Sequence, residues 1–156
     1  MQAALLHLVR CVFSIGLVLL ACAGIGYCSK ARAGGLTTGV HLVTAHLNST
    51  DLKPITPGLY ARLDSGALQG LTGGFYRNSY GDMSVYAGWT FESPARWFAV
   101  TVGAVTGYSA ARVMPLLVPS ARIPLAAGLA LRVAYIPKPV KQGHADALHL
   151  ATEFAF

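Results

Sequence analysis

The clearest pattern in this sequence is a regular alternation of apolar and polar residues. In residues 82–92 every second position is apolar: Met83, Val85, Ala87, Trp89 and Phe91. Residues 147–156 repeat the alternation, with large apolar side chains at Leu148, Leu150, Phe154 and Phe156. Because successive side chains of a β-strand point to opposite faces, each segment predicts a strand with one apolar and one polar face.

Less regular alternation predicts further strands in the rest of the chain, near residues 38–48, 58–64, 67–78, 96–107, 112–122 and 127–137. Turn-forming residues separate these segments, such as Asn-Ser-Thr-Asp at 48–51 and Asp-Ser-Gly at 64–66. No segment after residue 33 has the spacing and caps of an amphipathic helix. The chain is therefore predicted to be all-β, with eight strands.

Eight strands of about 10 residues are the smallest set that closes into an outer-membrane barrel. A water-soluble barrel needs many charges on its outside, but only 12% of this chain is charged and 54% is hydrophobic. We therefore predict an eight-stranded antiparallel up-and-down β-barrel of outer-membrane type, formed by residues 34–156 as one domain. The alternative is a small soluble β-sandwich in which Phe154 and Phe156 belong to the core.

The first 33 residues have the features of an export signal. Arg10 closes a short basic region, an apolar stretch follows, and Ala-Arg-Ala at 31–33 forms a small-x-small cleavage site. We predict a signal peptide at 1–33 and a mature barrel in the outer membrane of a Gram-negative envelope. Two alternatives remain: an uncleaved membrane anchor, and lipidation at Cys22, because residues 19–22 (Leu-Leu-Ala-Cys) resemble a lipoprotein box.

Charge and cysteine content exclude several kinds of chemistry. The net charge is +6, but no clustered basic face is visible, so we do not expect nucleic acid as a partner. The cysteines Cys11, Cys22 and Cys28 all lie in the leader, which excludes a disulfide framework and cysteine catalysis in the mature chain. We expect no metal, no cofactor and a monomeric barrel whose partners are membrane lipids.

Prolines mark an irregular place in the predicted barrel wall. Pro115, Pro119 and Pro124 fall in or beside the sixth expected strand, and Pro137 and Pro139 fall at the end of the seventh. Proline cannot donate to the hydrogen-bond ladder, so this part of the wall is expected to have broken pairing. Two interpretations remain open: a functional side opening, or a strand end with irregular turns.

Candidate chemistry lies at the ends of the first and third expected strands. His46 falls near the end of the first strand, and residues 76–80 (Tyr-Arg-Asn-Ser-Tyr) end the third. Odd strands of an up-and-down barrel run the same way, so these two ends share a rim. We therefore predict that His46 approaches Ser79, since a neutral imidazole near a hydroxyl can act as its base.

Five motifs, in order, resemble those of the outer-membrane lipid A palmitoyltransferases (the PagP family), and the likeness runs from about residue 43 to residue 156. The first two are residues 43–46 (Val-Thr-Ala-His) and 76–79 (Tyr-Arg-Asn-Ser), which match the segments that carry the family's catalytic His, Asp and Ser. The others are 88–89 (Gly-Trp), 114–117 (Met-Pro-Leu-Leu) and 134–137 (Ala-Tyr-Ile-Pro). Both chains end in Phe-x-Phe.

This resemblance implies an eight-stranded barrel that transfers an acyl chain from a phospholipid to lipid A or a similar glycolipid. It implies His46 as general base and Ser79 as hydroxyl partner. The family's Asp is Asn78 here, which cannot act as a base, and we expect its amide N–H to orient the site or stabilise an oxyanion. Restoring the carboxylate with Asn78→Asp is expected to raise activity.

For substrate binding we expect Gly88, Tyr86 and Arg77, with Gly88 as the floor of the acyl pocket, as the resemblance implies. Small residues at Gly70, Gly74, Gly103, Ala104 and Gly128 are expected to leave interior volume for a ligand. The alternative function is a non-catalytic outer-membrane barrel that binds lipid or a surface protein. A filled interior would favour that alternative.

Overall fold

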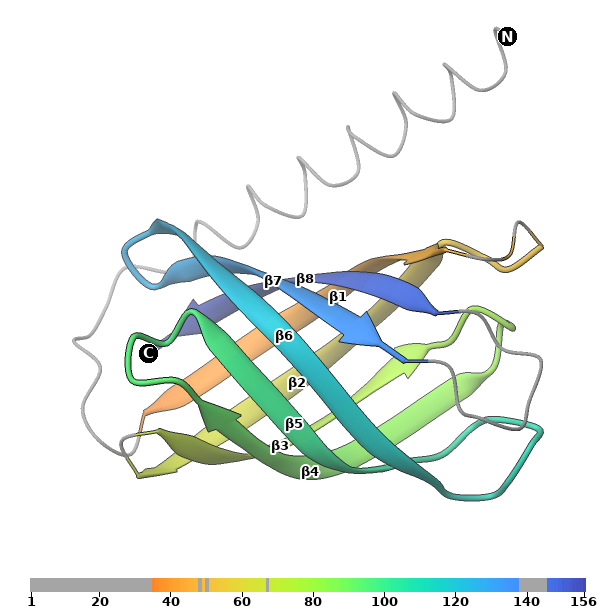
Figure 1. Ribbon diagram of the computed structural model, residues 1–156, viewed down its shortest axis with the longest axis horizontal. Coiled ribbons are helices and arrows are strands. Elements are labelled where there is room, and N and C mark those ends of the chain that lie inside the picture. Colours follow the sequence, from red (N-terminus) through yellow and green to blue (C-terminus); the bar gives the residue numbers. More distant parts are fainter. Residues whose placement is uncertain (1–34, 48, 50, 67, 138–145) are drawn as a thin grey trace, which may run out of the picture.

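The computed structural model describes residues 35–47, 49, 51–66, 68–137 and 146–156. Within them the chain forms an eight-stranded antiparallel closed β-barrel, as predicted (Figure 1). The strands are β1 (Leu36–His46), β2 (Ile55–Gly66), β3 (Gln69–Arg77), β4 (Met83–Glu92), β5 (Phe98–Val105), β6 (Met114–Ala126), β7 (Leu129–Ile136) and β8 (Ala147–Ala155). No helix of the described residues is long and apolar enough to cross a membrane. The predicted signal peptide at 1–33, with Cys22, lies outside the described residues.

The strands follow an up-and-down order in which each pairs with its sequence neighbours and β1 pairs with β8. Closure therefore joins the first and last strands, which would be the two edges of an open sheet. The chain end at Phe156 and the short connections, such as residues 127–128, lie at one end of the barrel, here called the turn end (left in Figure 1). The other end, here called the loop end, is where β1, β3, β5 and β7 end, and it carries the connections at residues 78–82 and 106–113.

The outer surface of the barrel is apolar. Large apolar side chains are exposed there on β2 to β6, among them Leu59, Leu71, Phe75, Met83, Val85, Trp89, Phe91, Val102, Leu117 and Ile123. The opposite face of β4 confirms the predicted alternation, because Ser84 and Thr90 are buried inside the barrel. Apolar side chains outside and polar ones inside are typical of an outer-membrane barrel, not of a soluble sandwich.

A β-bulge divides β1 into two halves. The register with both neighbouring strands shifts between His41 and Val43. Before the bulge, His41 points inward. After the bulge, Thr44 is buried and Ala45 is exposed. The extra residue therefore moves the inward face by one position, and His46 reaches the interior.

Two strands are longer than predicted, and prolines lie at their irregular places. β2 begins at Ile55, before Pro57, and β6 continues to Ala126, past Pro124. Pro57 lies opposite the β1 bulge, and Pro124 lies where the β6–β7 register shifts. A missing N–H is tolerated at such places because the ladder is already interrupted.

The glycines do not create the interior volume that we expected from them. A Cβ atom at Gly70 would lie 2.9 Å from the Arg62 side chain, and one at Gly74 would lie 2.6 Å from the Tyr60 side chain. A Cβ at Gly103 would meet the backbone of β4. These positions allow close approach of a side chain or a neighbouring strand, so they shape the wall.

Candidate functional site

His46 and Ser79 meet at the loop end of the barrel. His46 is the last residue of β1, and Ser79 lies in the turn that follows β3. The His46 Nε2 atom is 2.8 Å from the Ser79 hydroxyl oxygen, which is hydrogen-bond distance. The predicted approach of the two residues is confirmed. The catalytic role that we assign to them stays a prediction.

The turn that carries Ser79 is held by the side chain of Asn78. Its Oδ1 accepts the backbone N–H groups of Tyr80 and Asp82, both at 3.0 Å. Asparagine favours such turns because its side chain bonds to the backbone two residues on. Gly81 closes the turn with a φ of 101°, a conformation that L side chains rarely adopt. The Lys53 N–H also donates to the Ser79 carbonyl at 3.0 Å, which ties the turn to the β1–β2 connection.

The Asn78 amide is fully used in structural hydrogen bonds. Its Nδ2 donates to the Ser84 hydroxyl at 3.1 Å and to the Gly107 carbonyl at 2.7 Å. Asn78 is only 1% exposed. No amide hydrogen is therefore left for an oxyanion at Ser79. In Asn78→Asp a carboxylate oxygen would face the Gly107 carbonyl oxygen without a proton between them. This contact argues against the gain in activity that we expected from Asn78→Asp.

The other nitrogen of His46, Nδ1, has no orienting partner in the part of the chain that the structure describes. Among the described residues, nothing forms a hydrogen bond to the buried Nδ1 atom. When Nε2 accepts the Ser79 proton, Nδ1 must carry the ring hydrogen. The described part of the site is thus a serine–histidine pair, without a carboxylate that would fix the imidazole tautomer.

A cavity of about 500 Å³ leads from this pair into the barrel. His46, Ser79 and Tyr80 line its mouth at the loop end. Deeper in, it is lined by aromatic rings, among them Tyr60, Tyr76, Tyr86, His41 and His149. Tyr108 also lines it; burial raises the pKa of its phenol, and its hydroxyl contacts the Tyr76 hydroxyl at 2.7 Å. The interior therefore has room for a slim ligand.

A pair of interior histidines was not identified from the sequence as part of the site. His41 Nδ1 lies 2.7 Å from His149 Nε2, and His41 Nε2 lies 3.1 Å from the Tyr86 hydroxyl. This series of hydrogen bonds continues to Thr44, whose hydroxyl oxygen is 2.8 Å from His149 Nδ1. His41 and Thr44 belong to β1 and His149 belongs to β8, so these three residues meet only because the barrel closes.

The cavity also reaches the outside of the barrel beside β6. Pairing between β6 and β7 starts at Ser120, opposite Ala134, and the described residues form no β6–β7 pair nearer to the loop end. Residues 114–118 of β6 line the cavity without interruption, although their side chains alternate between the two faces. Pro119 has no N–H for the ladder. The proline-rich segment thus lines a stretch of wall without β6–β7 pairing, here called the side opening. That this opening is functional stays a prediction.

The predicted substrate-binding residues lie in three different surroundings. Tyr86 lines the cavity. Arg77 is exposed at the loop end, where its Nε donates to the Gly81 carbonyl at 2.9 Å. Gly88 faces inward on β4, but it is not among the residues that line the cavity, and a Cβ there would meet the backbone of Val102.

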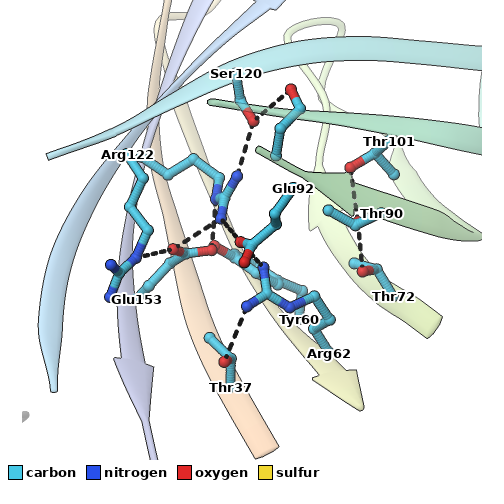
Figure 2. A network of polar contacts seen from close by, with 12 residues as sticks. Thr37, Tyr60, Arg62, Thr72, Thr90, Glu92, Thr101, Ser120, Arg122 and Glu153 are labelled. Carbon is cyan, nitrogen blue, oxygen red and sulfur yellow. Dashed lines mark hydrogen bonds and ion pairs between the residues drawn. The ribbon is translucent and has the colours of Figure 1, made fainter. Parts of the chain in front are cut away.

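The turn-end half of the interior holds a network of buried ion pairs, here called the ionic cluster (Figure 2). It comprises Arg62, Arg122 and Arg132 with Asp64, Glu92 and Glu153. Arg62 bonds to Glu92 at 2.6 Å, and Arg132 bonds to both Glu92 and Glu153. Tyr60 donates to Glu153 at 2.8 Å. Side chains from five strands thus cross-link the barrel interior below the cavity.

Comparison with known proteins supports the fold. No family model and no curated protein matches this chain. Among solved structures, the de novo designed barrel TMB2.3 is 13% identical, with a TM-score of 0.60 over 81% of this chain and 97% of its own. A second de novo designed transmembrane β-barrel is 17% identical, with a TM-score of 0.51 over 82% and 100%. The outer membrane protein Ail of Yersinia pestis is 15% identical, with a TM-score of 0.50 over 79% and 99%. At these identities the likeness shows an outer-membrane type of barrel and nothing more specific.

Proposed function

We propose that this chain is an outer-membrane acyltransferase that moves an acyl chain from a phospholipid to lipid A or a similar glycolipid. The observation that carries the proposal is the 2.8 Å contact between His46 and Ser79 at the mouth of the cavity. A hydroxyl beside an imidazole, above a slot that admits one chain, is the arrangement that acyl transfer needs. The resemblance to the lipid A palmitoyltransferases supports the same reaction.

The surface of the barrel supports a position in the outer membrane of a Gram-negative cell. Its exposed outer residues are apolar, while the ionic cluster is inside. Barrels of this type have their longer loops on the extracellular side and short turns on the periplasmic side. Ser79 would then face the outer leaflet, and the side opening at β6 would give a lipid chain lateral entry.

In the proposed reaction, His46 Nε2 takes the proton of Ser79 as its Oγ attacks the ester carbonyl of the phospholipid. The Oγ–acyl bond forms while the ester C–O bond breaks, and the proton passes to the leaving lysophospholipid oxygen. In the second half the acceptor hydroxyl gives its proton to His46, attacks the acyl-serine, and returns Ser79 to its hydroxyl form. Arg77, exposed at the same rim, would attract the phosphates of the lipids.

Mass spectrometry of lipid A from Gram-negative cells that express the chain tests this proposal. We expect a lipid A species heavier by one acyl group, lost in Ser79→Ala and in His46→Ala. The matched control is Ser93→Ala at the turn end, where the hydroxyl accepts the Phe98 N–H at 3.2 Å. Unchanged lipid A in cells with folded wild-type barrel would reject the acyltransferase proposal.

A second candidate is a non-catalytic barrel that holds a membrane lipid in its cavity. It is favoured because the Asn78 amide already donates its hydrogens to Ser84 and Gly107, and because His46 Nδ1 has no partner among the described residues. Native mass spectrometry of the purified barrel would show a bound phospholipid in that case, with the same occupancy in Ser79→Ala as in the wild type.

A further inference from the structure

Three threonine hydroxyls form a row on the cavity wall, across β3, β4 and β5 (Figure 2). The Thr72 and Thr90 hydroxyl oxygens are 2.6 Å apart, and those of Thr90 and Thr101 are 2.9 Å apart. All three residues line the cavity. This threonine row lies below the Ser79 mouth, at the level where the cavity meets the ionic cluster.

The threonine row has one hydroxyl hydrogen too many. Three hydroxyls supply three donors, and the two contacts between them use two of these donors. No contact of the described residues gives the third hydrogen an acceptor. The spare hydrogen belongs to Thr101 or Thr72 when the two bonds run in one direction along the row, and to Thr90 when Thr90 accepts from both neighbours. Thr101 is the most exposed of the three residues.

The neighbouring carboxylates do not need this donor. Glu92 is already bonded to Arg62 and Arg132. Glu153 accepts from Arg132 and Tyr60 and forms an ion pair with Arg122. With these acceptors engaged, an acceptor for the threonine row has to come from whatever fills the cavity.

The depth of the row decides which part of a bound chain it meets. Ser84 is buried near the loop end of β4, and Thr90 follows on the same inward face toward the turn end. Their separation is about 20 Å along the strand, or about 15 Å along the barrel axis at a strand tilt of about 40°. An acyl chain whose ester lies at Ser79 would bring its distal half, far from the carboxyl carbon, to Thr101.

We infer that the cavity selects an acyl chain that carries a hydroxyl group in its distal half. The substituent oxygen accepts the spare threonine hydrogen, and its own hydrogen donates back to a threonine oxygen. A plain methylene at that level leaves the threonine donor unpaired. This inference rests on the proposed lipid-binding cavity, but it does not depend on acyl transfer.

Ligand displacement tests the inference with the full chain in lipid nanodiscs and a fluorescent fatty acid in the cavity. The competitors are stearate, stearate with a hydroxyl in the distal half, and stearate with a hydroxyl beside the carboxyl group. We expect the distal hydroxyl to tighten binding about tenfold over stearate, and the carboxyl-side hydroxyl to leave it unchanged within about twofold. Equal binding of all three would overturn the inference and leave the lipid cavity in place. Absence of any fatty acid binding would instead overturn the proposed lipid-binding function.

Variants of the row locate the preference. Thr101→Val should reduce the preference for the distal hydroxyl to about twofold or less, whereas Thr101→Ser, which keeps the hydroxyl, should retain it. The matched control is Thr152→Val, because the Thr152 hydroxyl has no partner among the described residues and lies outside the cavity lining. Heat-modifiable gel migration confirms that each barrel is folded. If valine at all three row positions left the tenfold preference intact, the hydroxyl would be recognised elsewhere and the inference would fall.

Discussion

The two halves of the barrel interior are built from different chemistry. The turn-end half is filled by the ionic cluster, in which each buried carboxylate has an arginine partner. The loop-end half is lined by tyrosine and histidine rings around the cavity. Buried ion pairs need close, complete contacts, so the turn-end half is cross-linked, whereas the uncharged rings leave space. The turn-end half therefore stabilises the barrel, and the loop-end half is available to a ligand.

The strongest test of this difference is removal of Glu153 from the ionic cluster. Glu153→Ala leaves Arg132 and Arg122 without this carboxylate and Tyr60 without its acceptor. Loss of one partner of a buried pair should reduce the free energy of unfolding by about 3–5 kcal/mol. Urea unfolding of the barrel in lipid vesicles measures this change. Glu153→Leu combined with Arg132→Leu should recover part of the loss, and a single-variant effect under about 1 kcal/mol would contradict the role of the cluster.

The second test asks whether the barrel accepts charge only on its inside. Val102 lies in the middle of β5 and points outward, with 47% of its surface exposed. An arginine there would face hydrocarbon, so Val102→Arg should cost about 2–4 kcal/mol of unfolding free energy. Val113→Arg, in the connection at the loop end, is the matched control and should be nearly neutral. Equal tolerance at both positions in a vesicle-assembly assay would show that the outer face does not meet lipid.

The third and smallest test compares the same substitution in the two halves. Tyr60→Phe removes a hydrogen bond to the carboxylate of Glu153 and should cost about 1.5–3 kcal/mol. Tyr86→Phe removes a bond to the uncharged ring of His41 and should cost about 0.5–1.5 kcal/mol. Urea unfolding of both variants under the same conditions gives the difference. A larger loss for Tyr86→Phe would reverse our view of which half stabilises the barrel.

The fold could be predicted because it depends on local features of the sequence. Alternation in residues 82–92 and the low charge content are visible without any knowledge of pairing. The approach of His46 to Ser79 was also predictable, since His46 ends the first strand and Ser79 follows the third, and odd strands end at the same rim. The likeness to the palmitoyltransferases stays a prediction.

The parts that sequence reasoning missed depend on register. His41 and His149 are 108 positions apart in the sequence, and they meet only because β1 pairs with β8. The ionic cluster combines inward positions of five strands, and a shift of one residue in any of them would turn its charge outward. The role of Asn78 was assigned by analogy, but its hydrogen-bond partners, Ser84 and Gly107, come from other segments.

The bulge in β1 determines whether His46 points into the barrel or toward its outer surface. Counting in steps of two from His41 leads to Val43 and Ala45, and leaves His46 on the outer surface. The register shift after His41 instead places Thr44 and His46 inside. The bulge thus changes once along β1 which residues point inward. Without this single extra residue, the imidazole of His46 would be exposed on the outer wall and not beside the Ser79 hydroxyl.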